Sequence, residues 1–177
     1  MKIFRKLVSR LNSCRGQSIV EISLITPLLL IALYIPADFG VAFFMGNILA
    51  NAAREGSRIG SEMGKSGGNE ADRNFTTGDA ATVRDTVIPK MPSAVTSRSV
   101  RVRFYEDSAA NCMEVIEVTA SGNYNYFLYQ ILRLFGSTVP NSVTISRTTQ
   151  MPYRYQPYDN ATRCPSPPAV DELYSNV

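Results

Sequence analysis

The sequence predicts an α+β protein in which a long N-terminal transmembrane helix continues into an amphipathic helix packed on a small antiparallel β-sheet. Three observations support this prediction. A basic leader is followed by an apolar run long enough to cross a membrane. That run gives way to residues with the spacing of an amphipathic helix. Farther along, apolar and polar residues alternate in several short stretches, as they do in half-buried strands.

The composition excludes several classes of protein. At 177 residues the chain is too short for a TIM barrel or a two-domain dehydrogenase. Its hydrophobic content of 45% is far above that of disordered chains. Because there is no His, Ser-His-Asp and Cys-His catalysis and His-ligated metal sites are excluded. We therefore expect no catalytic residues, no metal and no cofactor.

The net charge of +3 hides an uneven distribution. Residues 1–16 contain five of the 18 Lys and Arg residues and none of the 15 acids, which leaves 13 cations against 15 acids for the remainder. Cations on one side of a transmembrane helix place that side in the cytoplasm. We therefore expect the chain after about residue 45 to be exported, and the basicity does not indicate nucleic-acid binding. The five cations are Lys2, Arg5, Lys6, Arg10 and Arg15.

The apolar run has the length of a membrane-spanning helix. No charged residue occurs between Ile22 and Ala37, and apolar residues continue past Asp38 to Phe44. A helix from about Ile19 to Phe44, rising roughly 1.5 Å per residue, crosses a hydrocarbon core of about 30 Å. Two alternatives stay open, namely the buried helix of a soluble protein and a cleaved secretory signal, although no convincing small-residue cleavage site follows the run.

Glu21 lies at the start of this apolar run. A carboxylate at the centre of a bilayer helix costs about 2.5–3.5 kcal/mol, and less near an end. One interpretation is that Glu21 occupies the first helical turn at headgroup depth, where the helix dipole favours an acid. The position of Glu21 in the sequence also suggests a further role. Gly16 directly precedes Gln17, and Glu21 is the fifth residue counted from Gln17.

Several segments in this order resemble the TadE-like minor pilins, or pseudopilins, of the tight-adherence (Tad/Flp) type IV pilus system. The segments are Gly16 followed by Gln-Ser-Ile-Val-Glu21, Pro27 within the helix, Phe39-Gly40 at its exit, and Ala52-Ala-Arg-Glu-Gly-Ser-Arg58. The resemblance is dense over residues 14–60 and thins to a strand pattern afterwards.

The resemblance implies a non-enzymatic minor pilin that is required for assembly of a pilus used in surface attachment. A prepilin peptidase would cut between Gly16 and Gln17, and Glu21 would pair with the new N-terminal amine of a neighbouring subunit. The other implied partners are further pilin or pseudopilin subunits, the inner-membrane pilus assembly platform and membrane lipid. The alternative is an uncleaved, signal-anchored periplasmic accessory or binding domain.

The same resemblance implies a single-pass protein of the bacterial inner membrane with a cytoplasmic N-terminus and a periplasmic C-terminal domain. Whether the protein also enters the extracellular pilus stays open. We expect three parts: a basic prepilin-type leader over residues 1–16, a transmembrane helix over 17–44 and an exported α+β domain over 45–177. A Pro-rich tail begins near residue 151 and is expected to be largely extended coil.

Beyond Phe44 the helix is expected to continue amphipathically to Met63. Within it, small residues recur at a spacing of four, which favours close approach of another helix. The alternative is that the glycines simply loosen the end of the helix. This candidate helix-packing face consists of Ala52, Gly56, Gly60 and Gly64.

The exported part is expected to contain one further helix and three strands. The helix covers Ala80 to Ile88, with Asp79 as its N-cap. Alternation predicts strands over Ser99–Tyr105 and Glu114–Ala120, which form an antiparallel hairpin, and a third over Ser142–Gln150. Arg101 and Arg103 are expected to face Glu114 or Glu117 across that hairpin. Tyr124–Phe135 is interpreted as a short helix or irregular layer.

Two further groups of residues carry predictions. Cys14 lies in the leader, so Cys112 and Cys164 are the two exported cysteines, and an oxidising compartment favours a disulfide between them. The alternative is two free thiols. A group of tyrosines is expected to pack the small domain rather than to form a contact surface. It comprises Tyr124, Tyr126, Tyr129, Tyr153, Tyr155 and Tyr158.

Overall fold

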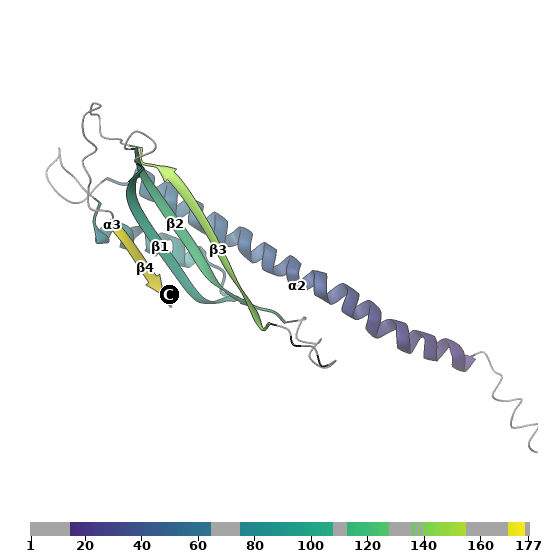
Figure 1. The fold of residues 1–177 in the computed structure, drawn as a ribbon. Helices are drawn as coiled ribbons and strands as arrows, with labels where there is room; N and C mark the ends of the chain where they lie inside the picture. The colour runs from purple at the N-terminus through teal and green to yellow at the C-terminus, as the bar shows by residue number, and fades with distance from the viewer. Residues whose placement is uncertain are drawn as a thin grey trace, which may run out of the picture. The chain divides into compact units, whose positions relative to one another are not determined.

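The computed structural model describes residues 15–64, 75–107, 113–127, 136, 138, 140–154 and 170–175 (Figure 1). The chain divides into two compact units. The first unit comprises Met1–Gly40 and Phe127–Val139, and the second comprises Val41–Tyr126 and Pro140–Val177. The α+β class and the long N-terminal helix are both confirmed.

Helix α2 covers Arg15–Glu62, in close agreement with the helix expected from the apolar run and its amphipathic continuation. Pro27 and Pro36 both lie inside α2. Each proline lacks the N–H that would bond the carbonyl one turn earlier. The helix nevertheless continues through both positions.

Helix α3 covers Thr77–Val87 and begins earlier than predicted. Its N-cap is Thr76, so the assignment of Asp79 as the N-cap was wrong. Asp79 instead completes a capping box, because its Oδ2 accepts the Thr76 backbone N–H at 2.7 Å while Thr76 Oγ1 accepts the Asp79 N–H at 3.3 Å. The helix ends at Val87, before the 3-10 helix η1, Ile88–Lys90, which contains Pro89.

A four-stranded antiparallel sheet forms the other part of the second unit. Its strands are β1, Val95–Asp107; β2, Met113–Asn125; β3, Ser142–Pro152; and β4, Val170–Ser175. They lie side by side in the order β3-β2-β1-β4 (Figure 1). The predicted hairpin is confirmed, with Phe104 opposite Ile116 and Val102 opposite Val118.

The core lies between one face of this sheet and the helices of the second unit. Buried and less buried positions alternate strictly along β2 and, in β1, from Val100 to Phe104, as their sequence pattern predicts. The side chains with no exposed surface include Leu49, Ala53, Val83, Val87, Val100, Val102, Ile116, Val118 and Ala120.

Two segments differ from the sequence-based expectation. The end of the chain is not all coil, because β4 pairs antiparallel with β1 and places Tyr174 opposite Val100. The expected layer over Tyr124–Phe135 was also partly wrong, since Tyr124 and Asn125 are the last residues of β2. In both cases the pairing partner is far away in sequence, so local pattern alone did not reveal it.

Three members of the tyrosine group are buried, which favours their packing role. Tyr124 and Tyr126 form an edge-to-face pair with ring centroids 5.8 Å apart. Tyr153 packs edge-to-face on Phe75 at 5.0 Å, and Phe75 stacks on Phe104. The other three, Tyr129, Tyr155 and Tyr158, lie outside the described residues.

Candidate functional site

The first half of α2 exposes apolar side chains on every side. All residues from Ser18 to Leu30 are exposed, and Leu24 exposes 76% of its surface. Among the described residues, α2 is the one helix long and apolar enough to cross a membrane, over Ser18–Glu62 with a mean hydropathy of 2.2 in its most apolar window. Contiguous apolar surface of this extent needs a nonaqueous partner. The helix therefore suggests a membrane anchor.

The residues expected at the processing site lie in the first turns of α2. Gly16 and Gln17 follow directly after Arg15, the first residue of the helix. Glu21 is exposed and is the seventh helical residue, so it does not occupy the first turn as one interpretation required. Because the dipole's effect fades beyond the first turn, it gives Glu21 little stabilisation.

Asp38 is a site residue that sequence reasoning missed. It exposes only 2% of its surface although its chain neighbours Ala37 and Phe39 are exposed. The backbone N–H of Phe127, in the same unit, donates a hydrogen bond to Asp38 Oδ1 at 3.3 Å. An isolated carboxylate in an apolar run was the available signal, since such a group requires a partner.

The candidate helix-packing face lies mostly inside the second unit. A Cβ atom on Gly56 would lie 2.4 Å from Val87 Cγ2 of α3, and one on Gly60 would lie 3.0 Å from Ile116 Cγ2 of β2. Ala52 is also buried. Gly64 differs, because it is exposed and a Cβ there would meet nothing within 4 Å. The small residues thus let the helix approach α3 and the sheet closely.

Polar contacts attach the end of α2 to β3 and the residues after it. Ser57 Oγ lies 3.0 Å from the carbonyl oxygens of both Ala53 and Thr149, and it can donate to either. The Arg154 backbone N–H donates to the Ser61 carbonyl at 2.9 Å. The periodicity of α2 did not predict these contacts. The Thr149 carbonyl and the Arg154 N–H are backbone groups, which leave no pattern in the sequence.

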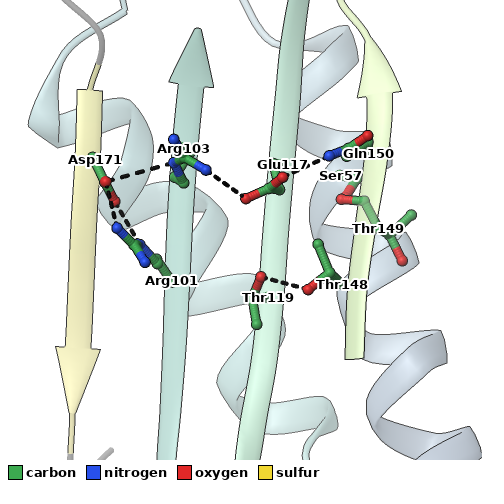
Figure 2. A network of polar contacts seen from close by, with 9 residues as sticks. All are labelled: Ser57, Arg101, Arg103, Glu117, Thr119, Thr148, Thr149, Gln150 and Asp171. Carbon is green, nitrogen blue, oxygen red and sulfur yellow. Dashed lines mark hydrogen bonds and ion pairs between the residues drawn. The ribbon is translucent and has the colours of Figure 1, made fainter. Parts of the chain in front are cut away.

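The sheet face opposite the helices carries a ladder of charged and polar side chains that crosses all four strands (Figure 2). Arg101 donates two hydrogen bonds to Asp171 on β4, at 2.7 and 2.6 Å. Arg103 donates to Glu117 at 3.1 Å, and Gln150 of β3 donates to the other oxygen of Glu117 at 2.6 Å. The prediction for Arg103 was correct, whereas Arg101 pairs with Asp171, a residue of the unpredicted strand.

Two carboxyl groups in the second unit have lowered pKa values because cations bond to them. The guanidinium of Arg101 holds the pKa of Asp171 below its usual value. Hydrogen bonds from Arg58 and Lys90 lower the pKa of Glu55 from 4.5 to about 2. All three of these ion pairs are solvent-exposed, so each contributes little to stability.

The predicted disulfide falls on residues that the structure does not describe. Cys112 and Cys164, like Cys14, lie outside the described residues. Within the described ranges, no group of three or more His, Cys, Asp or Glu side chains is arranged to hold a metal ion.

Comparison with known proteins finds a similarity in the helical segment. Residues 16–58 match the family model described as TadE-like protein, which confirms the resemblance drawn from the sequence. The similarity of this segment suggests an association with the Tad pilus. No curated protein and no solved structure matches the chain.

Proposed function

We propose that this chain, which is TadE-like over residues 16–58, is a non-enzymatic minor pilin required for assembly of a tight-adherence pilus used in surface attachment. The first half of α2 anchors it in the bacterial inner membrane, with the N-terminus in the cytoplasm and the second unit in the periplasm. Its partners are a prepilin peptidase, other pilin or pseudopilin subunits and the assembly platform.

One observation carries this proposal. The family match begins at Gly16, the residue after which processing is expected, and ends at Arg58, near the end of α2. It therefore includes both the exposed apolar half of the helix and the half that packs on the sheet. The leader before the match supplies the cations that favour a cytoplasmic N-terminus.

Glu21 has a defined role in the proposal. Cleavage after Gly16 gives Gln17 a free α-amino group, and Glu21 becomes the fifth residue of the mature chain. Pairing this carboxylate with the amine of a neighbouring subunit offsets the cost of burying both charges in a helix bundle. It also sets the axial register between subunits.

Processing is tested by the N-terminal residue of the mature protein. In cells that contain a prepilin peptidase, we expect the wild-type protein to begin at Gln17. Gly16→Leu should retain the intact leader, because a bulky side chain blocks close approach to the scissile bond. Cys14→Ser, two residues upstream, is the matched control and should be cut normally. An intact Met1 leader in wild-type cells would contradict the proposal and favour an uncleaved, signal-anchored accessory domain.

Assembly is tested by a pair of acid substitutions on the same helix. Glu21→Ala should insert in the membrane and be processed but should abolish pilus output. Glu62→Ala, at the other end of α2, should leave output unchanged, because the contact of Glu62 with Arg58, at 3.6 Å, is solvent-exposed. Normal pilus output from the Glu21→Ala strain would sink the proposed pairing.

A further inference from the structure

We propose that Phe127, two residues beyond β2, is a second membrane contact of this protein, and that Asp38 holds it at the boundary between the acyl chains and the headgroups. The inference rests on the proposed membrane anchoring by α2. It adds a lipid contact from a residue 89 positions further along the chain than Asp38.

The position of Asp38 along α2 defines the depth. The uncharged part of the helix that follows Glu21 ends at Ala37. Counted from Ile22 to Ala37 at 1.5 Å per residue, the helix rises about 24 Å, most of the roughly 30 Å of hydrocarbon in a bilayer. Asp38 is therefore the first charged residue of α2 after this run, and it lies near the outer edge of the hydrocarbon.

A carboxylate at this depth requires hydrogen-bond donors that compensate its loss of water. Asp38 is 2% exposed, and the Phe127 backbone N–H donates to its Oδ1 at 3.3 Å. Because this contact is direct, the backbone of Phe127 lies at the same depth as the carboxylate. The hydrogen bond thus fixes the depth of the backbone at Phe127, two residues after the end of β2.

The described part of the protein covers little of the Phe127 side chain. It exposes 80% of its surface, more than any other large apolar side chain among the described residues. Phe39, beside Asp38 on the helix, exposes 50%. Phenylalanine side chains that lie at the headgroup–acyl boundary bury their rings in lipid. Lipid is therefore the occupant that this depth and this exposure favour.

The test uses the absence of Trp from the chain, which makes any introduced Trp the single indole emitter. Full-length Phe127→Trp protein is reconstituted in phosphatidylethanolamine–phosphatidylglycerol vesicles whose acyl chains are either unmodified or brominated. Bromine quenches Trp on contact. Two reference variants accompany it: Leu33→Trp, 65% exposed within the anchor, and Met113→Trp, 39% exposed at the other end of β2. Met113 is about 40 Å from the end of that strand at 3.3 Å per residue.

We expect brominated lipid to quench Phe127→Trp to within about a factor of two of Leu33→Trp, since both indoles reach the acyl region. Met113→Trp should keep its emission. Quenching of Leu33→Trp without quenching of Phe127→Trp would overturn this inference and leave the anchor intact. Failure to quench Leu33→Trp would instead refute the anchoring itself. Emission from Phe127→Trp that shifts with protein concentration, without quenching by bromine, would identify a second copy of the chain as the occupant and overturn the lipid contact.

The role of Asp38 is tested in the Phe127→Trp background. Asp38→Asn keeps an oxygen acceptor for the backbone N–H of residue 127 and should preserve the quenching. Asp38→Ala removes the acceptor, so quenching of the introduced indole should fall toward the value for Met113→Trp. Asp38→Ala combined with Leu33→Trp should be quenched as strongly as Leu33→Trp alone. Equal quenching in the Asn and Ala variants, with circular dichroism showing unchanged helix content, would exclude Asp38 as the residue that holds Phe127.

Discussion

The two halves of α2 have similar helical geometry but opposite surfaces. From Ser18 to Gly40 the helix exposes large apolar side chains, with Leu24 at 76% and Leu28 at 68%. From Val41 to Glu62 the buried positions are mostly small, as at Ala52, Ala53 and Gly56. Large exposed residues suit a fluid partner such as lipid, whereas small residues allow one fixed neighbour to approach closely. The two halves therefore differ in the size of the side chains at their contact positions as well as in the apolar character that marks the first half as a candidate membrane span.

The largest difference in the free energy of unfolding should come from truncating one apolar side chain in each region, Ile116 against the second half of α2 and Leu28 on the first half. Ile116→Ala empties a fully buried position that faces Gly60, and it should lower the free energy of unfolding by about 2–5 kcal/mol. Leu28→Ala, on the exposed half, should change it by less than about 0.5 kcal/mol. Denaturant unfolding of the full chain in detergent micelles measures both. Equal losses would show that the first half is also packed in a fixed core.

The second test inserts a methyl group in each half. Gly56→Ala places a Cβ 2.4 Å from Val87 Cγ2 and should destabilise by about 1–3 kcal/mol, which exceeds the helix-propensity gain of up to about 1 kcal/mol. Gly40→Ala meets nothing within 4 Å, so the propensity gain remains and its thermal midpoint should be unchanged or higher. A Gly56→Ala midpoint at or above that of Gly40→Ala would mean that α2 and α3 do not hold a fixed separation.

The smallest effect concerns two serines that make the same local bond. Ser23 Oγ donates to the Ile19 carbonyl at 2.6 Å, and Ser57 Oγ lies 3.0 Å from the equivalent Ala53 carbonyl and also from that of Thr149. Ser57→Ala removes the contact with β3 and should cost about 1 kcal/mol, whereas Ser23→Ala should be nearly neutral. Hydrogen exchange of the β3 amides, which should rise only in the Ser57 variant, provides an independent measurement. Equal behaviour of the two variants would show that the serine does not hold the strand.

Much of the fold could be predicted because the signals are local. The apolar run and the helical spacing predicted α2, and strict alternation at Val100, Val102 and Phe104 predicted β1 and its burial. The start of α3 was misplaced because Thr76 and Asp79 are both good N-cap residues, and only the reciprocal bonds of the capping box distinguish them.

The unpredicted parts depend on contacts between distant residues. Strand β4 is six residues long and follows a segment rich in proline, so its alternation was too short to outweigh the coil signal. Asp38 was visible as a carboxylate in an apolar run, but its donor is the backbone N–H of Phe127, which has no signature in the side-chain sequence.

The sequence by itself determined where this protein is apolar, where its long helix lies and which residues of the hairpin strands face inward, because periodicity and charge are properties of neighbouring residues. It also contained the TadE-like segment over residues 16–58. Only the tertiary structure decided which partners meet. The sequence was compatible with a pairing of Arg101 with Glu114 or Glu117. Arg101 instead pairs with Asp171, because β4 lies beside β1 with Asp171 opposite Arg103. Strand order and register depend on the whole chain, so no local pattern specifies them.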